Sequence, residues 1–398
     1  MESPSSRVCL VFFNACVMRK NKLQQYREFI LDRGHRLVET PGEADLTLVW
    51  TCGFRADFRD ASLQALERIL ATTTGRVLIT GCLADICPER LPRNPRCQVM
   101  PWRDDVSTLE AVFGEGPALT GYDPVFVEEK LCDDTARCRL EHPDADYTFH
   151  DQFIKLVISE GCLFNCAYCS EKLAFPPFTS FPKERLVQAV REITARTGVY
   201  DIMLLADSLG QYGQDSGETF PGLLTALCAI DPRIGLALNN LNPASLVEHL
   251  DFLAGLIRNN RIRHLNLPIQ SASDKVLGLM RRTYTRQDLH AVYTLLADLA
   301  FTAHDTHLII GFPGETDEDF QETLDFILEH RPRFVLLSKY MESLGAPSAK
   351  LAGKVDAATM RKRLAVAEDV LAKAGIIFNS DDSELGRQRV RSLILNKR

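Results

Sequence analysis

Short apolar runs and amphipathic stretches alternate along the first third of the chain. The apolar runs are RVCLVFF (7–13), LTLVW (46–50) and RVLIT (76–80). Mostly apolar runs of this length are typical of parallel strands that are buried on both faces. Helical patterns lie between them at 21–33 and 56–70. The alternation predicts a small parallel βαβ domain over residues 1–127.

The same alternation restarts at residue 153 and continues for most of the remaining chain. Six apolar runs lie at 153–159, 201–206, 234–238, 264–269, 307–311 and 334–339. Helical patterns separate them, for example at 183–197, 286–299 and 315–329. Six successive β/α units predict a parallel sheet that curls into a partial (β/α)6 barrel over residues 151–376. The predicted fold class is therefore α/β.

Two polar segments complete the predicted organisation. Residues 128–150 are rich in Asp and Glu and are interpreted as a linker or a solvated strap. Residues 377–398 form a C-terminal tail with five basic side chains, Arg387, Arg389, Arg391, Lys397 and Arg398. A basic tail is usually solvated, although a strip of this kind can also bind anions.

Composition narrows the class of protein and its compartment. The chain has 398 residues, 45% of them hydrophobic and 25% charged, which is ordinary for a globular protein. Its apolar start is too short for a signal peptide, and no stretch approaches the ~20 apolar residues of a membrane span. We therefore expect a cytoplasmic protein with no membrane partner. In that reducing compartment its 12 cysteines are expected to bind metal or to act in catalysis rather than to form disulfides.

Three cysteines in the segment GCLFNCAYC (161–169) carry the most chemical information. Cys162, Cys166 and Cys169 have the spacing C-x3-C-x2-C and follow the first predicted barrel strand. In α/β folds, ligands bind at the loops that follow the strands. Each iron of a four-iron cubane needs a ligand, and ferredoxin-type sites usually supply four cysteines. Three thiolates therefore leave one iron without a protein ligand. The alternatives are a structural zinc site, for which nearby histidines are missing, or three core cysteines.

A second set of cysteines lies in the N-terminal domain. Cys16, Cys52 and Cys82 each follow a predicted parallel strand by two or three residues. Because neighbouring parallel strands end at the same edge of a sheet, these three thiols can meet and hold a second cluster with an open iron. The alternative is that they are small buried hydrophobes. The six remaining cysteines show no matching placement.

The chain resembles the radical S-adenosylmethionine (SAM) methylthiotransferases from about residue 7 to residue 375. Four segments carry the resemblance besides the two cysteine sets. They are LADSLGQYG (205–213), LPIQSASD (267–274), MRRTYT (280–285) and GFPGET (311–316). The last segment alone would be weak evidence for the family, because Gly and Pro occur at any turn from a strand to a helix. The four segments and the two cysteine sets together form a pattern that is specific for this family.

The resemblance implies two [4Fe–4S] clusters and SAM as cofactors. Cys162, Cys166 and Cys169 match the ligands of the SAM cluster, and Cys16, Cys52 and Cys82 match those of an auxiliary cluster. The first cluster would reduce SAM to a 5′-deoxyadenosyl radical with an electron from an external donor such as flavodoxin or ferredoxin. The second would offer sulfur to the resulting carbon radical. The residues expected to contact SAM are Tyr168, Asp207, Ser208, Gln270 and Arg282. Tyr168 can equally pack beneath the cluster.

Departures from the family pattern bear on the substrate. The family's C-x-x-P-x-x-R-G run is absent after Cys169, Asp207 stands in place of Gln, and His307 stands in place of Asp. After the helix predicted at 356–374 only 24 residues remain, too few for the family's C-terminal RNA-binding barrel. With the net charge of −7, this favours sulfur insertion into a small-molecule or nucleoside substrate. The alternatives are a tRNA or ribosomal-protein methylthiotransferase and a non-catalytic iron–sulfur electron carrier or sensor.

Overall fold

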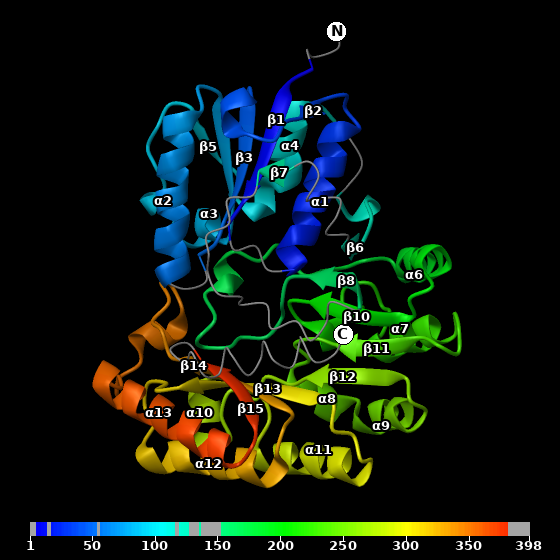
Figure 1. The fold of residues 1–398 in the computed structure, drawn as a ribbon, viewed down its shortest axis with the longest axis vertical. Coiled ribbons are helices and arrows are strands. Elements are labelled where there is room, and N and C mark those ends of the chain that lie inside the picture. The colour runs from blue at the N-terminus through cyan, green and yellow to red at the C-terminus, as the bar shows by residue number, and fades with distance from the viewer. Residues whose placement is uncertain are drawn as a thin grey trace.

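The protein is described here from a computed structural model. It describes residues 5–13, 17–53, 56–115, 119–126, 135–136 and 153–380. Within these residues there are two mainly parallel β-sheets, one formed mostly by the first third of the chain and one by the rest, and helices cover both (Figure 1). No helix among the described residues is both long enough and apolar enough to cross a membrane.

The N-terminal sheet is parallel, as the sequence predicts. Its strand order is β2-β1-β3-β4-β5, and β7 pairs with β1 at Leu10 and Val11, beyond the two residues that pair with β2. The strands are β1 (Arg7–Phe12), β2 (Arg36–Leu37), β3 (Leu46–Thr51), β4 (Arg76–Gly81), β5 (Cys97–Val99) and β7 (Thr135–Ala136). The three predicted strands form its centre, and the short edge strands β2 and β5 were not predicted. Strand β7 lies within residues 128–150, which are interpreted above as a linker or a solvated strap, and the rest of that segment lies outside the described residues.

Helices cover both faces of this sheet. They are α1 (Val17–Leu31), α2 (Ala56–Thr72), α3 (Cys82–Ile86) and α4 (Asp105–Phe113). Figure 1 shows α2 on one side of the sheet and α1 with α4 on the other. Because side chains alternate across a strand, Val8 and Leu10 pack in the core of the α1 side, whereas Cys9 and Val11 pack with α2.

The second sheet contains the predicted barrel. Its order is β15-β14-β13-β12-β11-β10-β8-β6, with β9 paired to β8. The strands are β6 (Val125–Phe126), β8 (Ile154–Glu160), β9 (Thr179–Ser180), β10 (Asp201–Ala206), β11 (Gly235–Leu238), β12 (Ile262–Asn266), β13 (His304–Ile310), β14 (Phe334–Lys339) and β15 (Ile377–Ser380). From β8 to β14 the strands are parallel and in chain order, which confirms the α/β fold with a partial barrel.

Two details of the barrel prediction were wrong. Strand β12 begins and ends earlier than the apolar run at 264–269, and it ends before Pro268, which cannot donate a ladder hydrogen bond. Residues 377–380 form strand β15 against β14, whereas the sequence pattern predicts that they belong to the tail. Residues 381–398, which carry the five basic side chains of that tail, lie outside the described residues.

Helices of the barrel lie outside its sheet (Figure 1). They are α6 (Lys183–Thr197), α7 (Phe220–Cys228), α8 (Pro243–Glu248), α9 (Leu250–Arg258), α10 (Asp274–Leu279), α11 (Arg286–Asp298), α12 (Asp317–His330) and α13 (Ala357–Lys373). One hydrophobic core runs from the α1 side of the N-terminal sheet into the barrel. The two sheets are therefore parts of one packed unit.

The two carboxyl-terminal strand edges face each other. Helix α1 begins where β1 ends, and its Arg19 contacts Asp207, which directly follows β10. Helix α3, which starts at Cys82, lies against the turn Glu171–Leu173, just beyond Cys169. The fold thus brings the loops of both cysteine sets to one interface.

Candidate functional site

The cysteine triplet lies on the loop that follows β8. Gly161 opens the loop with φ +81°, and a Cβ there would lie 2.8 Å from the Pro176 carbonyl oxygen, so the sharp turn requires glycine. Cys162, Cys166 and Cys169 are each half-buried. The loop therefore presents three thiols at the carboxyl edge of the barrel, where such folds bind ligands.

Hydrogen bonds from distant segments fix the backbone of this loop. The Gly161 N–H donates to Asp207 Oδ2 at 2.9 Å, and the Leu163 N–H donates to Gln211 Oε1 at 2.9 Å. The Ala167 N–H donates to the Met280 carbonyl at 2.9 Å. Because the partners come from separate barrel loops, the positions of the thiols depend on the whole barrel edge.

The three thiols are not gathered as the ligands of a single zinc ion would be. Around one zinc ion, tetrahedral Zn–S bonds of 2.3 Å would place sulfur atoms about 3.8 Å apart. Among the described residues, the one trio of ligand atoms that lie mutually within 4.8 Å is found elsewhere, so the three thiols are more widely spaced. Burial raises the pKa of the Cys162 thiol and of the Cys169 thiol. A bound cationic centre would supply the charge that makes them thiolates.

Arg282 connects the triplet to the barrel wall. Its Nη1 lies 3.4 Å from Cys166 Sγ and 3.2 Å from the Tyr168 hydroxyl. Its Nη2 donates to the Pro268 carbonyl at 2.8 Å, and its Nε donates to the Tyr284 hydroxyl at 2.7 Å. Burial raises the pKa of Tyr284 to about 12, although the guanidinium opposes this shift. A fixed cation thus lies beside one thiol, suited to an anionic ligand.

The other residues predicted to contact SAM differ in the interactions that their side chains and backbone already make. Both oxygens of Asp207 already accept hydrogen bonds, from Arg19 and from the Gly161 N–H. The Ser208 hydroxyl is buried beside the Cys162 thiol, and its hydrogen bond favours the thiolate, opposing the rise in the pKa of Cys162 that burial causes. Gln270 has a left-handed backbone with φ +67°, an uncommon conformation for a residue with a side chain. Of the three, Ser208 is therefore the one whose side chain lies directly beside the cysteine triplet.

The second cysteine set is partly described. Thr51 and Gly81 are partners on adjacent strands β3 and β4, so Cys52 and Cys82, the residues that follow, lie side by side. Both are buried. The Cys52 N–H donates to Ser62 Oγ of α2 at 3.0 Å, which anchors this loop to a helix. Cys16 lies outside the described residues.

An ion pair that the sequence analysis missed lies between the two cysteine loops. Arg19 Nη2 is 2.9 Å from Asp207 Oδ1, and their side chains are only 3% and 7% exposed. The guanidinium also lies 3.9 Å from the centre of a Trp102 ring. Burial raises the pKa of Asp207, although Arg19 opposes this shift. The pair directly couples helix α1 to the residue that holds the start of the triplet loop.

A second buried cation lies one helical turn further along α1. Lys22 Nζ is 3.1 Å from Glu160 Oε2 and 3.2 Å from Asp105 Oδ2. Tyr26, a further turn along, donates to Asp105 Oδ2 at 2.9 Å. Burial alone would lower the pKa of Lys22, but Glu160 and Asp105 outweigh it and raise that pKa. An acidic Glu160 at the end of a mostly apolar strand was the one sequence signal for this network.

The inside of the barrel carries a group of polar side chains from β12 and β13. His304 contacts Tyr293 of α11 outside the barrel, so Asp305 and His307, at alternate positions, face the interior. His264 Nε2 lies 2.7 Å from Asp305 Oδ2, and Asn266 Nδ2 lies 3.1 Å from His307 Nε2. Burial lowers the pKa of His307 to about 4, so this ring is neutral at pH 7. Neutral imidazole and amide groups can both donate and accept hydrogen bonds to a substrate.

Two family descriptions match separate parts of the chain. The Radical SAM superfamily matches residues 156–327, which include the triplet and most of the barrel. The uncharacterized protein family UPF0004 matches residues 9–100, which include Cys16, Cys52 and Cys82. The two matches correspond to the two sheets.

Several curated proteins are similar to the chain over most of its length. The threonylcarbamoyladenosine tRNA methylthiotransferases of Xenopus laevis and Danio rerio are 29% and 30% identical to it. The matches cover 80% and 79% of this chain but 57% of each of those proteins. A protein of Methanocaldococcus jannaschii named probable threonylcarbamoyladenosine tRNA methylthiotransferase is 25% identical, over 92% of this chain and 82% of that protein. The chain thus spans little more than half the length of the two animal relatives.

Solved structures of low sequence identity share the fold. The radical SAM methyltransferase TsrM from Kitasatospora setae, with cobalamin and a [4Fe–4S] cluster bound, superposes with a TM-score of 0.59. The match has 15% identity and covers 84% of this chain and 75% of that one. The cobalamin-dependent SAM radical enzyme OxsB gives a TM-score of 0.58 at 10% identity, covering 99% of this chain and 61% of that one. At these identities the likeness concerns the fold alone.

Proposed function

Because the chain belongs to the radical-SAM methylthiotransferase family, we propose that it attaches sulfur, as a methylthio group, to an unactivated carbon of a tRNA nucleoside. The observation that carries the proposal is the meeting of the two cysteine loops at one interface, next to a polar barrel interior. Radical formation and sulfur delivery have to act on the same substrate atom, so their sites must lie close together.

SAM and two [4Fe–4S] clusters are the cofactors used in this family. Cys162, Cys166 and Cys169 would hold the first cluster, and Cys16, Cys52 and Cys82 would hold the second. When bound, the cofactors would supply the 5′-deoxyadenosyl radical, the sulfur and, from a second SAM, the methyl group, which is chemistry that no side chain can perform. The contribution of the chain is to bind, orient and shield the reactants.

Individual side chains fit defined parts of that task. Arg282 is the cation that would bind the carboxylate of SAM beside Cys166. Ser208, whose buried hydroxyl lies beside Cys162, would contact the same ligand. Asn266 and His307, in the barrel interior, would donate and accept hydrogen bonds to the edge of a nucleobase. An external one-electron donor such as flavodoxin or ferredoxin completes the reaction.

Similarity to relatives favours tRNA as the substrate over the small molecule expected from the sequence. The relatives described above, with identities of 25–30%, all bear the name of a tRNA methylthiotransferase. A net charge of −7 does not oppose this choice, because phosphate binding needs only a local group of basic side chains. Adenosine carrying a threonylcarbamoyl group is the nucleoside that their names indicate.

The test is a reaction with the anaerobically reconstituted enzyme, SAM, a one-electron reductant and tRNA from cells that lack the modification. Digestion of the tRNA and mass spectrometry of its nucleosides should show one adenosine derivative that gains a methylthio group. The free nucleoside is tested in parallel. Turnover of the free nucleoside but not of tRNA would restore the small-molecule reading.

A different outcome would contradict any catalytic role for the chain, whichever substrate is tested. If reduced enzyme leaves SAM intact while its clusters are fully loaded, the chain is an electron carrier or sensor. Binding to tRNA should also weaken steeply with salt, because each neutralised phosphate releases counterions. Affinity that does not change with salt would argue against tRNA.

A further inference from the structure

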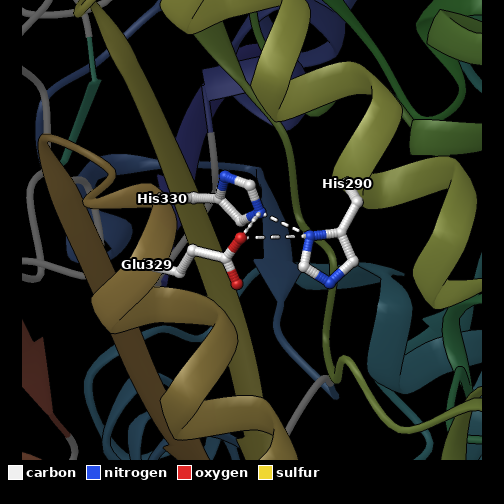
Figure 2. A group of neighbouring side chains, drawn as sticks. All are labelled: His290, Glu329 and His330. Carbon is white, nitrogen blue, oxygen red and sulfur yellow. Dashed lines mark hydrogen bonds and ion pairs between the residues drawn. The ribbon is translucent and has the colours of Figure 1, made fainter.

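Two histidines and a glutamate meet on the outer helical layer of the barrel, away from the cysteine loops. His290 lies in α11, and Glu329 and His330 form the last turn of α12. Figure 2 shows the three side chains pointing toward one another from the two neighbouring helices. In Figure 1 these helices lie at the opposite end of the molecule from the N-terminal sheet.

The ligand atoms of this trio are close together. His290 Nδ1 lies 2.8 Å from His330 Nε2. Glu329 Oε1 lies 3.7 Å from the first nitrogen and 3.8 Å from the second. Among the residues that the structure describes, no other set of three His, Cys, Asp or Glu ligand atoms lies within 4.8 Å of one another.

We propose that His290, Glu329 and His330 form a binding site for a divalent transition metal ion, with zinc as the best fit. Two imidazoles and a carboxylate are a donor set that zinc uses in three-ligand sites, where water takes the fourth position. Bonds of 2.0–2.1 Å in tetrahedral geometry place neighbouring donor atoms about 3.3 Å apart. Each distance in the trio therefore has to change by only about half an ångström.

Neighbouring side chains hold both imidazole rings in place and leave the site accessible to an ion from solvent. His330 packs on Phe326 with ring centres 4.5 Å apart, and His290 lies 5.0 Å from the same ring. The side chain of Glu329 is 58% exposed, so it can adjust and admit an ion from solvent. Helix α12 ends here, with Arg331 in the left-handed conformation. The partial negative charge of a helix C-terminus favours a nearby cation.

The positive charge of Arg286, next to His290, is expected to weaken metal binding, and this gives a further test of the site. Arg286 Nε donates to His290 Nε2 at 3.4 Å, and Arg286 also pairs with Glu322 at 3.8 Å. Neutral imidazole carries one proton, so coordination through Nδ1 moves that proton to Nε2. The contact from Arg286 is then lost, and its positive charge repels the ion. Removing this charge should tighten binding.

The metal would tie α11 to α12. The ion would join side chains 40 residues apart and would stabilise the folded state, because an unfolded chain does not hold the trio together. This role is independent of the radical chemistry proposed above. Zinc is therefore expected to raise the unfolding temperature without changing the rate of SAM cleavage.

The test uses the anaerobic enzyme with both clusters loaded, so that the cluster cysteines are not available to zinc. One equivalent of Zn²⁺ is added and its binding is measured by competition with a chelating dye. X-ray absorption at the zinc edge should show nitrogen and oxygen neighbours at 2.0–2.1 Å, with the signature of imidazole. A sulfur shell at about 2.3 Å would overturn the proposal, and so would an affinity no tighter than that of an unfolded chain.

Matched variants separate the site from general metal binding. Glu329→Gln keeps the shape of an exposed side chain and should weaken binding by about tenfold or more, as should His290→Ala. Arg286→Gln should tighten binding. His249→Ala, at another half-buried histidine between α8 and α9, is the control and should bind zinc like the wild type. Equal affinity in Glu329→Gln, His290→Ala and the control would reject the site even where the wild type binds zinc.

Discussion

Cysteines follow parallel strands in both halves of the molecule, but the two sets are assembled differently. In the barrel, Cys162, Cys166 and Cys169 share one loop of eight residues. In the N-terminal sheet, Cys52 and Cys82 come from two adjacent strands, about 30 residues apart in the chain. The barrel set therefore depends on local spacing, and the N-terminal set depends on strand order and register.

The two sets are also held in place by different forces. Gly161 and Leu163 of the barrel loop donate hydrogen bonds to Asp207 and Gln211, and the first of these acceptors belongs to a buried ion pair. At the N-terminal edge, close backbone packing dominates. A Cβ on Gly81 would lie 2.3 Å from the Thr51 carbonyl oxygen. One edge should accordingly be sensitive to charge, and the other to side-chain size.

The largest expected effect separates the two sets by function. Cys166→Ala should abolish cleavage of SAM, whereas Cys52→Ala/Cys82→Ala should still produce 5′-deoxyadenosine but no methylthiolated product. The reason is that radical formation needs only the triplet. Iron analysis should give about eight irons per wild-type chain, since each of the two cubanes holds four. Each variant should lose one of the two clusters and retain about four irons.

Cys228→Ala, in α7, is the matched control for this comparison, because that thiol lies at neither edge. It should retain the iron content and the product of the wild type. Loss of SAM cleavage in Cys52→Ala/Cys82→Ala at unchanged folding would show that the two edges do not act separately.

The local set could be predicted from sequence, and much of the fold with it. The six barrel strands and the triplet follow from short-range patterns, and the position of Cys52 beside Cys82 follows from parallel pairing. Strand β15 could not be predicted, because four residues with two apolar side chains give no periodicity. Strand β7 consists of only two residues. Such edge strands are defined by the neighbour they pair with.

Interactions between distant residues were not predictable from spacing. Arg19 and Asp207 are separated by 188 positions, and although Asp207 was expected to contact SAM, nothing in the sequence pairs it with Arg19. Likewise, His290 and His330 meet only because α11 packs against α12. Burial gives these polar side chains their importance, and burial of charge is decided by tertiary packing.

The next effect tests whether charge holds the barrel edge. Arg19→Met leaves the buried Asp207 carboxylate without its partner, and such changes cost about 3–5 kcal/mol of stability. Urea unfolding measures the loss. Adding Asp207→Asn should restore part of it, because the buried charge is then removed while an acceptor for the Gly161 N–H remains.

The Arg7–Asp45 pair supplies the control for that experiment. Its distance of 2.8 Å is similar, but its side chains are 56% and 49% exposed. Arg7→Met should change the stability little, since solvent screens exposed pairs. Equal losses in Arg19→Met and Arg7→Met would remove charge burial as the basis of the comparison.

A steric change tests the N-terminal edge. Gly81→Ala places a methyl group against the backbone of Thr51 at φ +93° and should destabilise the protein by about 2–4 kcal/mol. The same substitution at Gly255, in α9, meets no atom within 4 Å and should stabilise by up to about 1 kcal/mol. Thermal unfolding of both variants measures the contrast. A neutral Gly81→Ala would mean that close packing does not hold this edge.

The smallest effect concerns pH at the barrel edge. Asp319 accepts hydrogen bonds from Ser273 Oγ at 2.7 Å, Lys275 Nζ at 2.7 Å and the Thr316 N–H at 2.8 Å, and so joins the loops that follow β12 and β13. Burial alone would raise the pKa of Asp319, but these hydrogen bonds outweigh it and lower the pKa from 3.8 to about 2. Since the folded pKa lies below the unfolded one, this carboxylate stabilises the protein above pH 4. Its contribution is lost as the pH falls toward 2.

Asp319→Asn should therefore cost about 2 kcal/mol at pH 7 and at pH 5, from a shift of nearly two pKa units at 1.36 kcal/mol each. At pH 3, between the two pKa values, the difference from wild type should shrink by about half. Urea unfolding at the three pH values measures it, with the exposed Asp298→Asn as a control that should show no such trend. A difference that stays constant from pH 7 to pH 3 would mean that the charge on Asp319 does not stabilise the barrel edge. The contrast between a charged barrel edge and a close-packed N-terminal edge would then rest on the Arg19–Asp207 pair alone.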